Sequence, residues 1–159
     1  MSTLELLKYD LDGDHHRYDN YYNSTWELKE IALEDCGSWP QFGGLPHNIT
    51  KGSILDTVDA IKPLLENKNK LSINTGRLLY IEELMKYVED IIDYIPIIVM
   101  EDAVIRHNNL RPLAQRKKYK ICKYDIDDGN HRATALALLG KKKVLALVGK
   151  RIYKNNILY

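Results

Sequence analysis

The sequence predicts an α+β domain, in which helices pack against a small mixed sheet. Within residues 119–127, apolar side chains recur at every second position from Cys122 on, and the Ala- and Leu-rich run that follows the next turn continues without Gly or Pro to Gly140. This order is typical of a strand, a tight turn and a helix. Earlier in the chain, a helical apolar pattern over 81–95 precedes the apolar segment 97–100, which predicts an interior strand.

Chain length and composition are those of a single globular domain. The 159 residues include 45% hydrophobic and 28% charged residues, and the net charge is +1. Such a balance gives no global field that would attract nucleic acid or a membrane. The longest apolar run, around Ile95 to Met100, is far too short to span a bilayer, and no signal sequence follows Met1. We therefore expect a soluble cytoplasmic protein with no membrane partner.

Cysteine and tyrosine usage indicates packing. The two cysteines, Cys36 and Cys122, are far apart in the sequence and fit neither a metal-ligand pair nor a redox pair. Both are predicted to be buried thiols. Eleven tyrosines against one phenylalanine are unusual, but scattered tyrosines are interpreted here as half-buried packing residues and not as a platform for stacking bases.

The N-terminal half of the chain is predicted to contain two helices separated by a loop. Residues 24–35 are expected to form a short helix, and the Gly- and Pro-rich segment 36–52 is expected to be a loop. A second helix starts at Ser53, where Asp56 occupies the third position of a capping box. Pro63 should end or kink this helix.

A longer amphipathic helix is predicted over residues 81–95, preceded by a strand at 71–74. Its apolar side chains recur at i, i+3, i+4 and i+7, which predicts one face buried against the sheet. Glu82 and Glu83 lie on the opposite side. Pro96 should stop the helix before the strand at 97–100.

The turn Asp128–Arg132 joins a predicted strand to a predicted helix. Gly129 removes the Cβ where the backbone must turn sharply, and the first helical turn leaves its N–H groups unpaired at the positive end of the helix dipole. An anion is favoured at such a place. Arg132 offers a permanently charged fork, His131 a donor that titrates near neutrality, and Asp128 a carboxylate that could hold a metal ion or orient a hydroxyl. The alternative is that Asp128 caps the helix and that His131 and Arg132 are solvated.

A larger pattern around this turn resembles the ParB/sulfiredoxin superfamily. It comprises the strand Pro96–Met100, the Asp-Gly-x-His-Arg turn, the helix closed by Gly140 and the segment Lys143–Val148, and it covers about residues 75–150. The resemblance implies a core at 71–150 with residues 1–70 as an N-terminal elaboration of one domain, 1–159. It also implies that the turn binds nucleotide phosphates, through Gly129, Asn130, His131 and Arg132.

Departures from the superfamily limit what can be transferred. Sulfiredoxins have a cysteine at the position of Asn130, so their sulfur chemistry is not expected. Partition proteins of the ParB type continue into a helix-turn-helix and a dimerisation domain, whereas this chain stops at Tyr159. The free-serine kinases of the superfamily have Asp-Gly-His-His-Arg, and Asn130 replaces their first histidine. Small relatives with nuclease or nucleotidase activity are the other group that this chain could join.

Three other segments are candidate sites. The resemblance makes Glu82 and Glu83 possible catalytic carboxylates beside the nucleotide, although a solvated helix face would show the same residues. The basic segment 106–118 follows the strand at 97–100 and could grip a polynucleotide, or it could be a solvated loop that balances the acidic helix. Its candidate nucleic-acid contacts are Arg111, Arg116, Lys117 and Lys118. The cluster Asp10–His16 could bind a metal ion, or it could be a polar surface turn.

Three functions remain open from the sequence. The first is a phosphoryl-transfer or nucleotide-hydrolysing enzyme, a small-molecule kinase, nucleotidase or nuclease, that uses ATP, ADP or CTP with Mg²⁺. In it, Asp128, His131 and Glu82 would be catalytic, Asp128 would also bind the metal, and the acceptor would be water or a hydroxyl-bearing substrate. The second is a non-catalytic module that binds nucleotide or DNA and is related to partition proteins. The third is a structural protein in which the turn only starts a helix.

Overall fold

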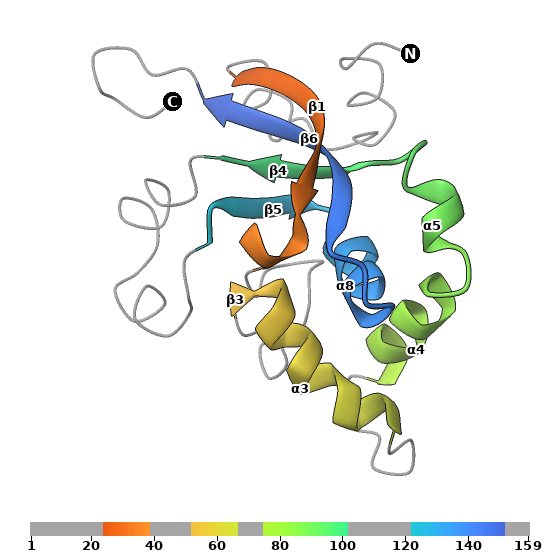
Figure 1. The fold of residues 1–159 in the computed structure, drawn as a ribbon. Helices are drawn as coiled ribbons and strands as arrows, with labels where there is room; N and C mark the ends of the chain where they lie inside the picture. Colours follow the sequence, from red (N-terminus) through yellow and green to blue (C-terminus); the bar gives the residue numbers. More distant parts are fainter. Residues whose placement is uncertain (1–23, 39–51, 67–74, 102–121, 152–159) are drawn as a thin grey trace.

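In the part of the chain that the structure describes, six strands form one mixed sheet in the order β1-β6-β4-β5-β2-β3 (Figure 1). The computed structural model describes residues 24–38, 52–66, 75–101 and 122–151. The strands are β1 (Ser24–Ala32), β2 (Cys36–Ser38), β3 (Gly52–Ser53), β4 (Ile97–Met100), β5 (Tyr124–Asp128) and β6 (Lys143–Arg151).

Among the described strands, two parallel and three antiparallel pairings hold this sheet together. The longest is the antiparallel ladder of β1 and β6, which runs from Ser24 opposite Arg151 to Ala32 opposite Lys143. Strand β4 lies between β6, to which it is parallel, and β5, to which it is antiparallel. Strand β2 continues the sheet parallel to β5, and β3 pairs antiparallel with β2. Strand β5, which leads into the turn at 128–132, and its neighbour β4 therefore lie between β6 on one side and β2 on the other.

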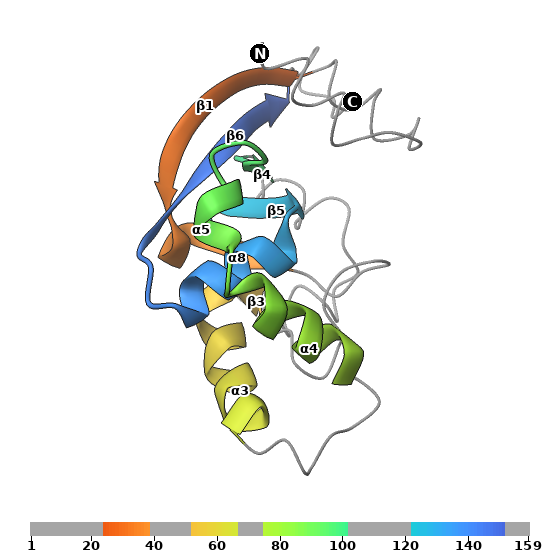
Figure 2. The ribbon, with the colours of Figure 1, turned by 90° about the vertical axis from the view of Figure 1, so that its right-hand side faces the viewer.

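Helices cover one face of the sheet, as Figure 2 shows. They are α3 (Ile54–Glu66), α4 (Thr75–Leu84), α5 (Val88–Ile91) and α8 (Asn130–Leu138), and a short 3₁₀ helix, η1 (Leu33–Asp35), connects β1 to β2. Helix α8 packs against both α3 and α4. The core between helices and sheet includes buried side chains from all these layers, such as Ile61, Ile81, Leu136, Ile126 and Val99. This packing fixes the start of α8 beside α4.

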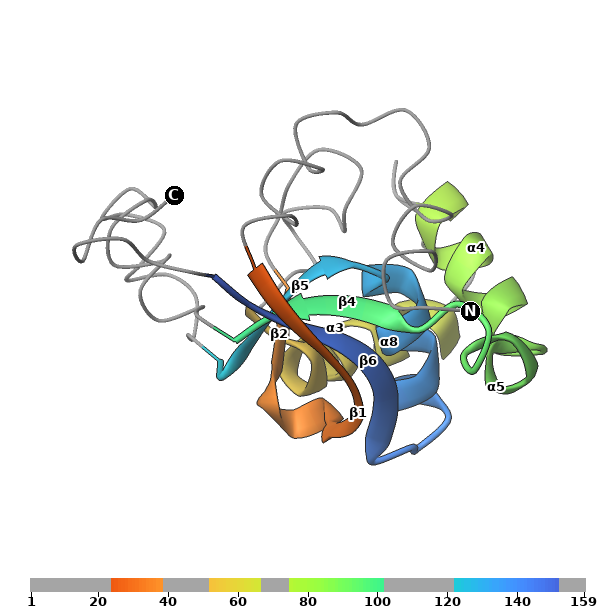
Figure 3. The same ribbon diagram turned by 90° about the horizontal axis from the view of Figure 1, so that it is seen from above.

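On the face of the sheet away from the helices, the partly buried Trp26 and the buried Met100 lie on either side of Gly149, across strands β1, β6 and β4. Trp26 of β1 is paired with Gly149 of β6, which is paired in turn with Met100 of β4. The indole ring occupies the space beside Gly149, because a Cβ there would lie 2.7 Å from two atoms of the ring. Figure 3 shows β1 and β6 crossing over the sheet together.

The prediction of a helix at 24–35 is wrong. Residues Ser24–Ala32 are the strand β1, and only Leu33–Asp35 are helical, as a 3₁₀ turn. Local composition here includes good helix formers such as Glu, Leu and Lys, but every residue of β1 has a partner in β6. Tertiary pairing of this length overrides a propensity of a few tenths of a kcal/mol per residue.

The prediction of an uninterrupted loop at 36–52 is also wrong at both of its ends. Residues Cys36–Ser38 form β2 and Gly52 opens β3, while residues 39–51 lie outside the described part of the chain. The capping prediction at Ser53 is confirmed, because the Asp56 backbone N–H donates to Ser53 Oγ at 3.1 Å. Helix α3 does not end at Pro63 and continues to Glu66.

The single helix predicted over 81–95 consists of two. Helix α4 starts at Thr75 and ends at Leu84, and α5 follows after a turn in which Tyr87 has φ −141° and ψ 2°. The predicted buried face is confirmed, since Ile81, Leu84, Val88 and Ile92 are buried. The strand predicted at 71–74 falls outside the described residues.

The strands and the helix predicted around the turn are confirmed. All four residues of β4 are buried, and Tyr124 and Ile126 of β5 lie in the core. Helix α8 ends as predicted at Gly140, whose φ is 79°. The Gly140 N–H donates to Ala137 O and the Lys141 N–H to Leu136 O, which together form a Schellman motif. The α+β class is therefore confirmed. Among the described helices, none is long and apolar enough to cross a membrane.

Candidate functional site

The backbone of the turn between β5 and α8 requires glycine. Gly129 has φ 99°, in the left-handed region. A Cβ at this position would lie 2.6 Å from Ile97 Cγ2 and 2.9 Å from Arg132 Nη2, so both conformation and space exclude a larger residue. Gly129 is also the N-cap of α8, and no side chain caps the helix there. The first turn of α8 thus presents backbone N–H groups at the positive end of the helix.

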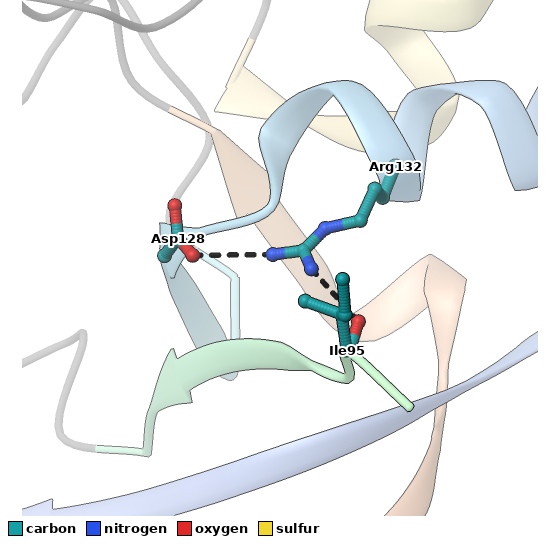
Figure 4. Close-up of polar contacts among 3 residues, drawn as sticks. All are labelled: Ile95, Asp128 and Arg132. Atoms are coloured by element: carbon teal, nitrogen blue, oxygen red, sulfur yellow. Dashed lines mark hydrogen bonds and ion pairs between the residues drawn. The ribbon is translucent and has the colours of Figure 1, made fainter. Parts of the chain in front are cut away.

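Arg132 ties the turn to the strand next to it. Its Nη2 donates to Asp128 Oδ2 at 3.1 Å, and its Nη1 donates to the Ile95 carbonyl oxygen at 2.8 Å, as Figure 4 shows. Its side chain is only 11% exposed and that of Asp128 is 30% exposed. The guanidinium therefore orients the Asp128 carboxylate and fixes the end of β5 relative to the segment before β4.

These contacts decide against the alternative in which Asp128 caps the helix and Arg132 is solvated. The N-cap is Gly129, and the Asp128 carboxylate accepts a hydrogen bond from Arg132 one turn further along α8. Two donors of the Arg132 fork are directed at protein oxygens. That Arg132 also contacts a phosphate stays a prediction.

His131 contacts helix α4. Arg77 Nη1 lies 3.2 Å from His131 Nε2, and since arginine can only donate, the imidazole accepts through Nε2 and carries its proton on Nδ1. The Tyr80 ring packs nearly edge-on against the imidazole, with the ring centroids 5.3 Å apart and the planes at 70°. Side chains from two helices thus meet beside the N-terminus of α8.

The expectation that His131 titrates near neutrality is wrong. Burial, and next to it the positive charge of Arg77, lower the pKa of His131 from 6.5 to about 4, although Asp128 acts in the opposite direction and Arg132 adds to the lowering. The imidazole is therefore neutral at physiological pH. Positive charge at this site comes from Arg77 and Arg132 and not from His131.

Asn130 is the first residue of α8 and is 5% exposed. Its backbone carbonyl accepts a hydrogen bond from Thr134 Oγ1 at 2.6 Å. Its side-chain Oδ1 is buried, and among the described residues this atom has no hydrogen-bond partner. A buried polar atom without a partner is costly, and one explanation for such an atom is a functional role. Asn130 thus has an amide oxygen beside the turn that no described residue satisfies.

The acidic residues of α4 are not brought to the turn by the contacts described. Successive residues of an α-helix are rotated by about 100°, which places Glu82 on the side of α4 away from Tyr80. Glu83 forms an exposed ion pair with Lys86 at 2.8 Å. The prediction that Glu82 is catalytic remains a prediction.

Other predicted sites lie outside the described residues. These are the basic contacts Arg111, Arg116, Lys117 and Lys118 and the cluster Asp10–His16. In the parts of the chain that are described, no three His, Cys, Asp or Glu side chains gather as a metal site. Cys36 and Cys122 are buried thiols, as predicted, and burial raises the pKa of Cys36 to about 12.

Arg77 and Tyr80 are the site residues that sequence reasoning missed. Both are exposed, Tyr80 by 50%, and they occupy a stretch where the predicted helix had not yet begun. Their spacing of three residues, on a helix that starts at Thr75, would have placed them on one face. Recognising that face required knowing that α4 starts six residues before the apolar repeat.

Comparison of the chain with protein-family models, with curated proteins and with solved structures finds no match.

Proposed function

We propose that this protein binds a nucleotide through its phosphates at the start of α8 and is a phosphoryl-transfer or nucleotide-hydrolysing enzyme of the ParB/sulfiredoxin type. The observation that carries the proposal is the start of α8 at Gly129, without a side-chain cap, beside the exposed cation Arg77. A side-chain cap would occupy one of the four N–H groups at the helix start, so without a cap more of them can bind an anion.

Phosphate binding would use the backbone and Arg77 together. The N–H groups of the first turn and the helix dipole favour an anion at this place. Arg77 adds a planar guanidinium suited to phosphate oxygens, and its contact with His131 holds it on the α8 side of α4. Because His131 is neutral, its Nδ1–H can serve as a further donor without titrating.

Asp128 is the carboxylate best placed for chemistry. The ion pair with Arg132 fixes its orientation next to the helix start, so it can accept a proton from an attacking hydroxyl or water. A single carboxylate also fits Mg²⁺, which is commonly held by one or two carboxylates together with substrate phosphates. Bound with the nucleotide, the metal would neutralise phosphate charge. The acceptor that this arrangement would serve is water or a hydroxyl-bearing small molecule, which covers a nucleotidase, a nuclease and a small-molecule kinase.

The experiment that tests binding is a thermal-shift series with ATP, ADP and CTP, each with and without Mg²⁺. A ligand at a hundred times its Kd adds about 2.7 kcal/mol, which raises the Tm of a domain of this size by several degrees. We expect wild type to be stabilised by at least one nucleotide and Arg77→Gln to lose most of that shift. Lys62→Gln, which removes an exposed cation on α3, is the matched control and should respond as wild type does.

Arg132→Ala is unsuitable as the binding probe, because it leaves the Asp128 carboxylate without its ion-pair partner and should lower Tm without any ligand. If no nucleotide raises the Tm of wild type, the proposed function fails, and the turn is a structural start of a helix. If a nucleotide stabilises wild type, turnover is measured next by phosphate release with wild type and Asp128→Asn. Loss of release with retained binding would identify Asp128 as catalytic.

A further inference from the structure

Tyr80 presents an aromatic ring beside the proposed phosphate site without contributing to the core. Its neighbours Leu78, Ile81 and Leu84 are buried members of the core, whereas Tyr80 is 50% exposed. Single exposed aromatic residues are common on protein surfaces. Tyr80 differs in its position, because its ring contacts the imidazole of His131 in the first turn of α8.

Among the described residues, nothing crowds the backbone one helical turn before Tyr80. Side chains on a helix generally lean toward its N-terminus, and the turn before Tyr80 contains Gly76 and Arg77. A Cβ built on Gly76 would have no heavy atom within 4 Å. Residue 76 is one helical turn before Tyr80 on the same side of α4, and a glycine there adds no side chain of its own to that space.

We infer that the ligand is a nucleoside phosphate whose base stacks on the Tyr80 ring while its phosphates lie at the start of α8 beside Arg77. This inference rests on the proposed function. It departs from the expectation that all the tyrosines serve packing. The contact of 5.3 Å between the rings of Tyr80 and His131 keeps the base platform and the anion site adjacent, as the covalent link between a base and its own phosphates requires.

Stacking on Tyr80 predicts that the ligand carries a nucleobase and is not an inorganic polyphosphate. Every base has an aromatic face, so stacking on a single ring distinguishes nucleotides from polyphosphates but discriminates little among bases. Arg77 lies three residues before Tyr80, on the same side of α4. Its guanidinium is therefore within one helical turn of the ring, so α4 would contribute to binding both the base and the phosphates that lie at the start of α8.

Isothermal titration of the full chain with ADP, ATP and inorganic tripolyphosphate tests the inference. The variants are Tyr80→Ala, Tyr80→Phe, and Tyr94→Ala as the control that removes another exposed tyrosine ring. We expect Tyr80→Ala to weaken ADP and ATP binding about tenfold, the loss typical of one stacked base. Tyr80→Phe and Tyr94→Ala should leave the nucleotide affinities unchanged, and no variant should change the affinity for tripolyphosphate.

The outcomes separate the inference from the function on which it rests. Unchanged ADP affinity in Tyr80→Ala would overturn base stacking while leaving phosphate binding intact. Equal weakening of ADP and tripolyphosphate in Tyr80→Ala would also overturn it, because the ring would then act on the phosphate site itself. If wild type binds neither nucleotide nor tripolyphosphate, both the inference and the proposed function are wrong.

Discussion

The residues at and beside the turn divide into buried residues that hold its backbone and exposed residues that can meet a ligand. Gly129 is required because its φ of 99° and the neighbouring Ile97 leave no room for a side chain. Arg132 and Asp128 are partly buried and satisfy each other, while Arg77 and Tyr80 remain exposed beside them. The structural part of the site therefore lies inside the turn, and the part that can meet a ligand lies on α4 and on the helix start.

Substitution by alanine should have opposite effects on stability at Gly129 and at Gly76. Gly129→Ala combines a positive φ with overpacking and should destabilise the protein by about 2–4 kcal/mol. Gly76→Ala, which has open space and lies within α4, should stabilise by about 0.5 kcal/mol because alanine restricts the unfolded chain. Urea unfolding of both variants measures the difference. Equal effects would contradict the backbone conformation described for Gly129.

His131 should make stability fall in mild acid. Its pKa is lowered from 6.5 to about 4 in the folded protein, so the unfolded chain binds more protons between these values. The free energy of unfolding therefore decreases as the pH falls from about 6.5 to about 4, and His131 has no effect above pH 7. At pH 4.5 the loss should be about 2 kcal/mol.

The measurement compares wild type with His131→Gln in urea at pH 7.5 and pH 4.5. The variant lacks the titrating imidazole, so it should lose less stability than wild type over this interval by that amount. Carboxylates that titrate in the same window are common to both proteins and cancel in the comparison. Parallel loss in the two proteins would show that the imidazole is not shielded as described.

At the scale of elements, contacts between segments far apart in the sequence override local preference. Strand β1 forms because each of its residues pairs with β6, and the helix predicted over 81–95 divides into α4 and α5. Both changes alter which residues face the site. A helix that begins at Thr75 brings Arg77 and Tyr80 alongside α8, and the early break after Leu84 leaves Glu83 in a surface ion pair with Lys86.

Because Trp26 of β1 packs on Gly149 of β6, substitutions at these two positions should have non-additive effects on the free energy of unfolding. Gly149→Ala would place a Cβ 2.7 Å from the indole ring and 2.8 Å from Met100 Sδ, which should cost about 1–3 kcal/mol. In a Trp26→Leu background the same substitution should cost less, because the smaller side chain leaves room. A double-mutant cycle by thermal or urea unfolding gives the coupling. Additive effects would show that the indole ring does not occupy this space.

At the scale of the whole molecule, the charge balance favours local recognition. The net charge is +1, so a small nucleotide should be held by the few groups at the turn and not by a long-range field. A polynucleotide gripped by several Lys and Arg side chains would release many counterions on binding. The two ligands therefore differ in how strongly their binding depends on salt.

Salt dependence distinguishes the enzyme from a DNA-binding module. Between 50 and 200 mM salt, ADP affinity should fall by less than about fivefold, since only a few charges are involved. Binding of a DNA duplex through the segment 106–118 would fall by about a thousandfold if six or more phosphates were contacted. Fluorescence anisotropy with labelled ligands measures both. Tight DNA binding with the steep slope, lost in a Lys117→Gln/Lys118→Gln double variant, would favour the module.

Sequence patterns were sufficient to predict the elements in which local pattern and local chemistry agree. The strand before the turn, the turn glycine, the helix closed by Gly140, the cap at Ser53 and the buried strand at 97–100 were all predictable. In each, residues close together in the chain set the backbone conformation.

How these elements combine into a candidate site depends on contacts between distant parts of the chain, which appear only in the folded protein. Residues 24–32 are rich in helix formers, and their local sequence does not predict their pairing with residues 143–151. Arg132 was expected to face an anion, but its fork reaches Ile95, a residue far away in the sequence. Arg77 and Tyr80 belong to no sequence motif, and their role is apparent only from their contacts with His131 in the folded chain. The physical reason is the same throughout: side-chain roles at this site depend on neighbours that are brought together only when the chain folds.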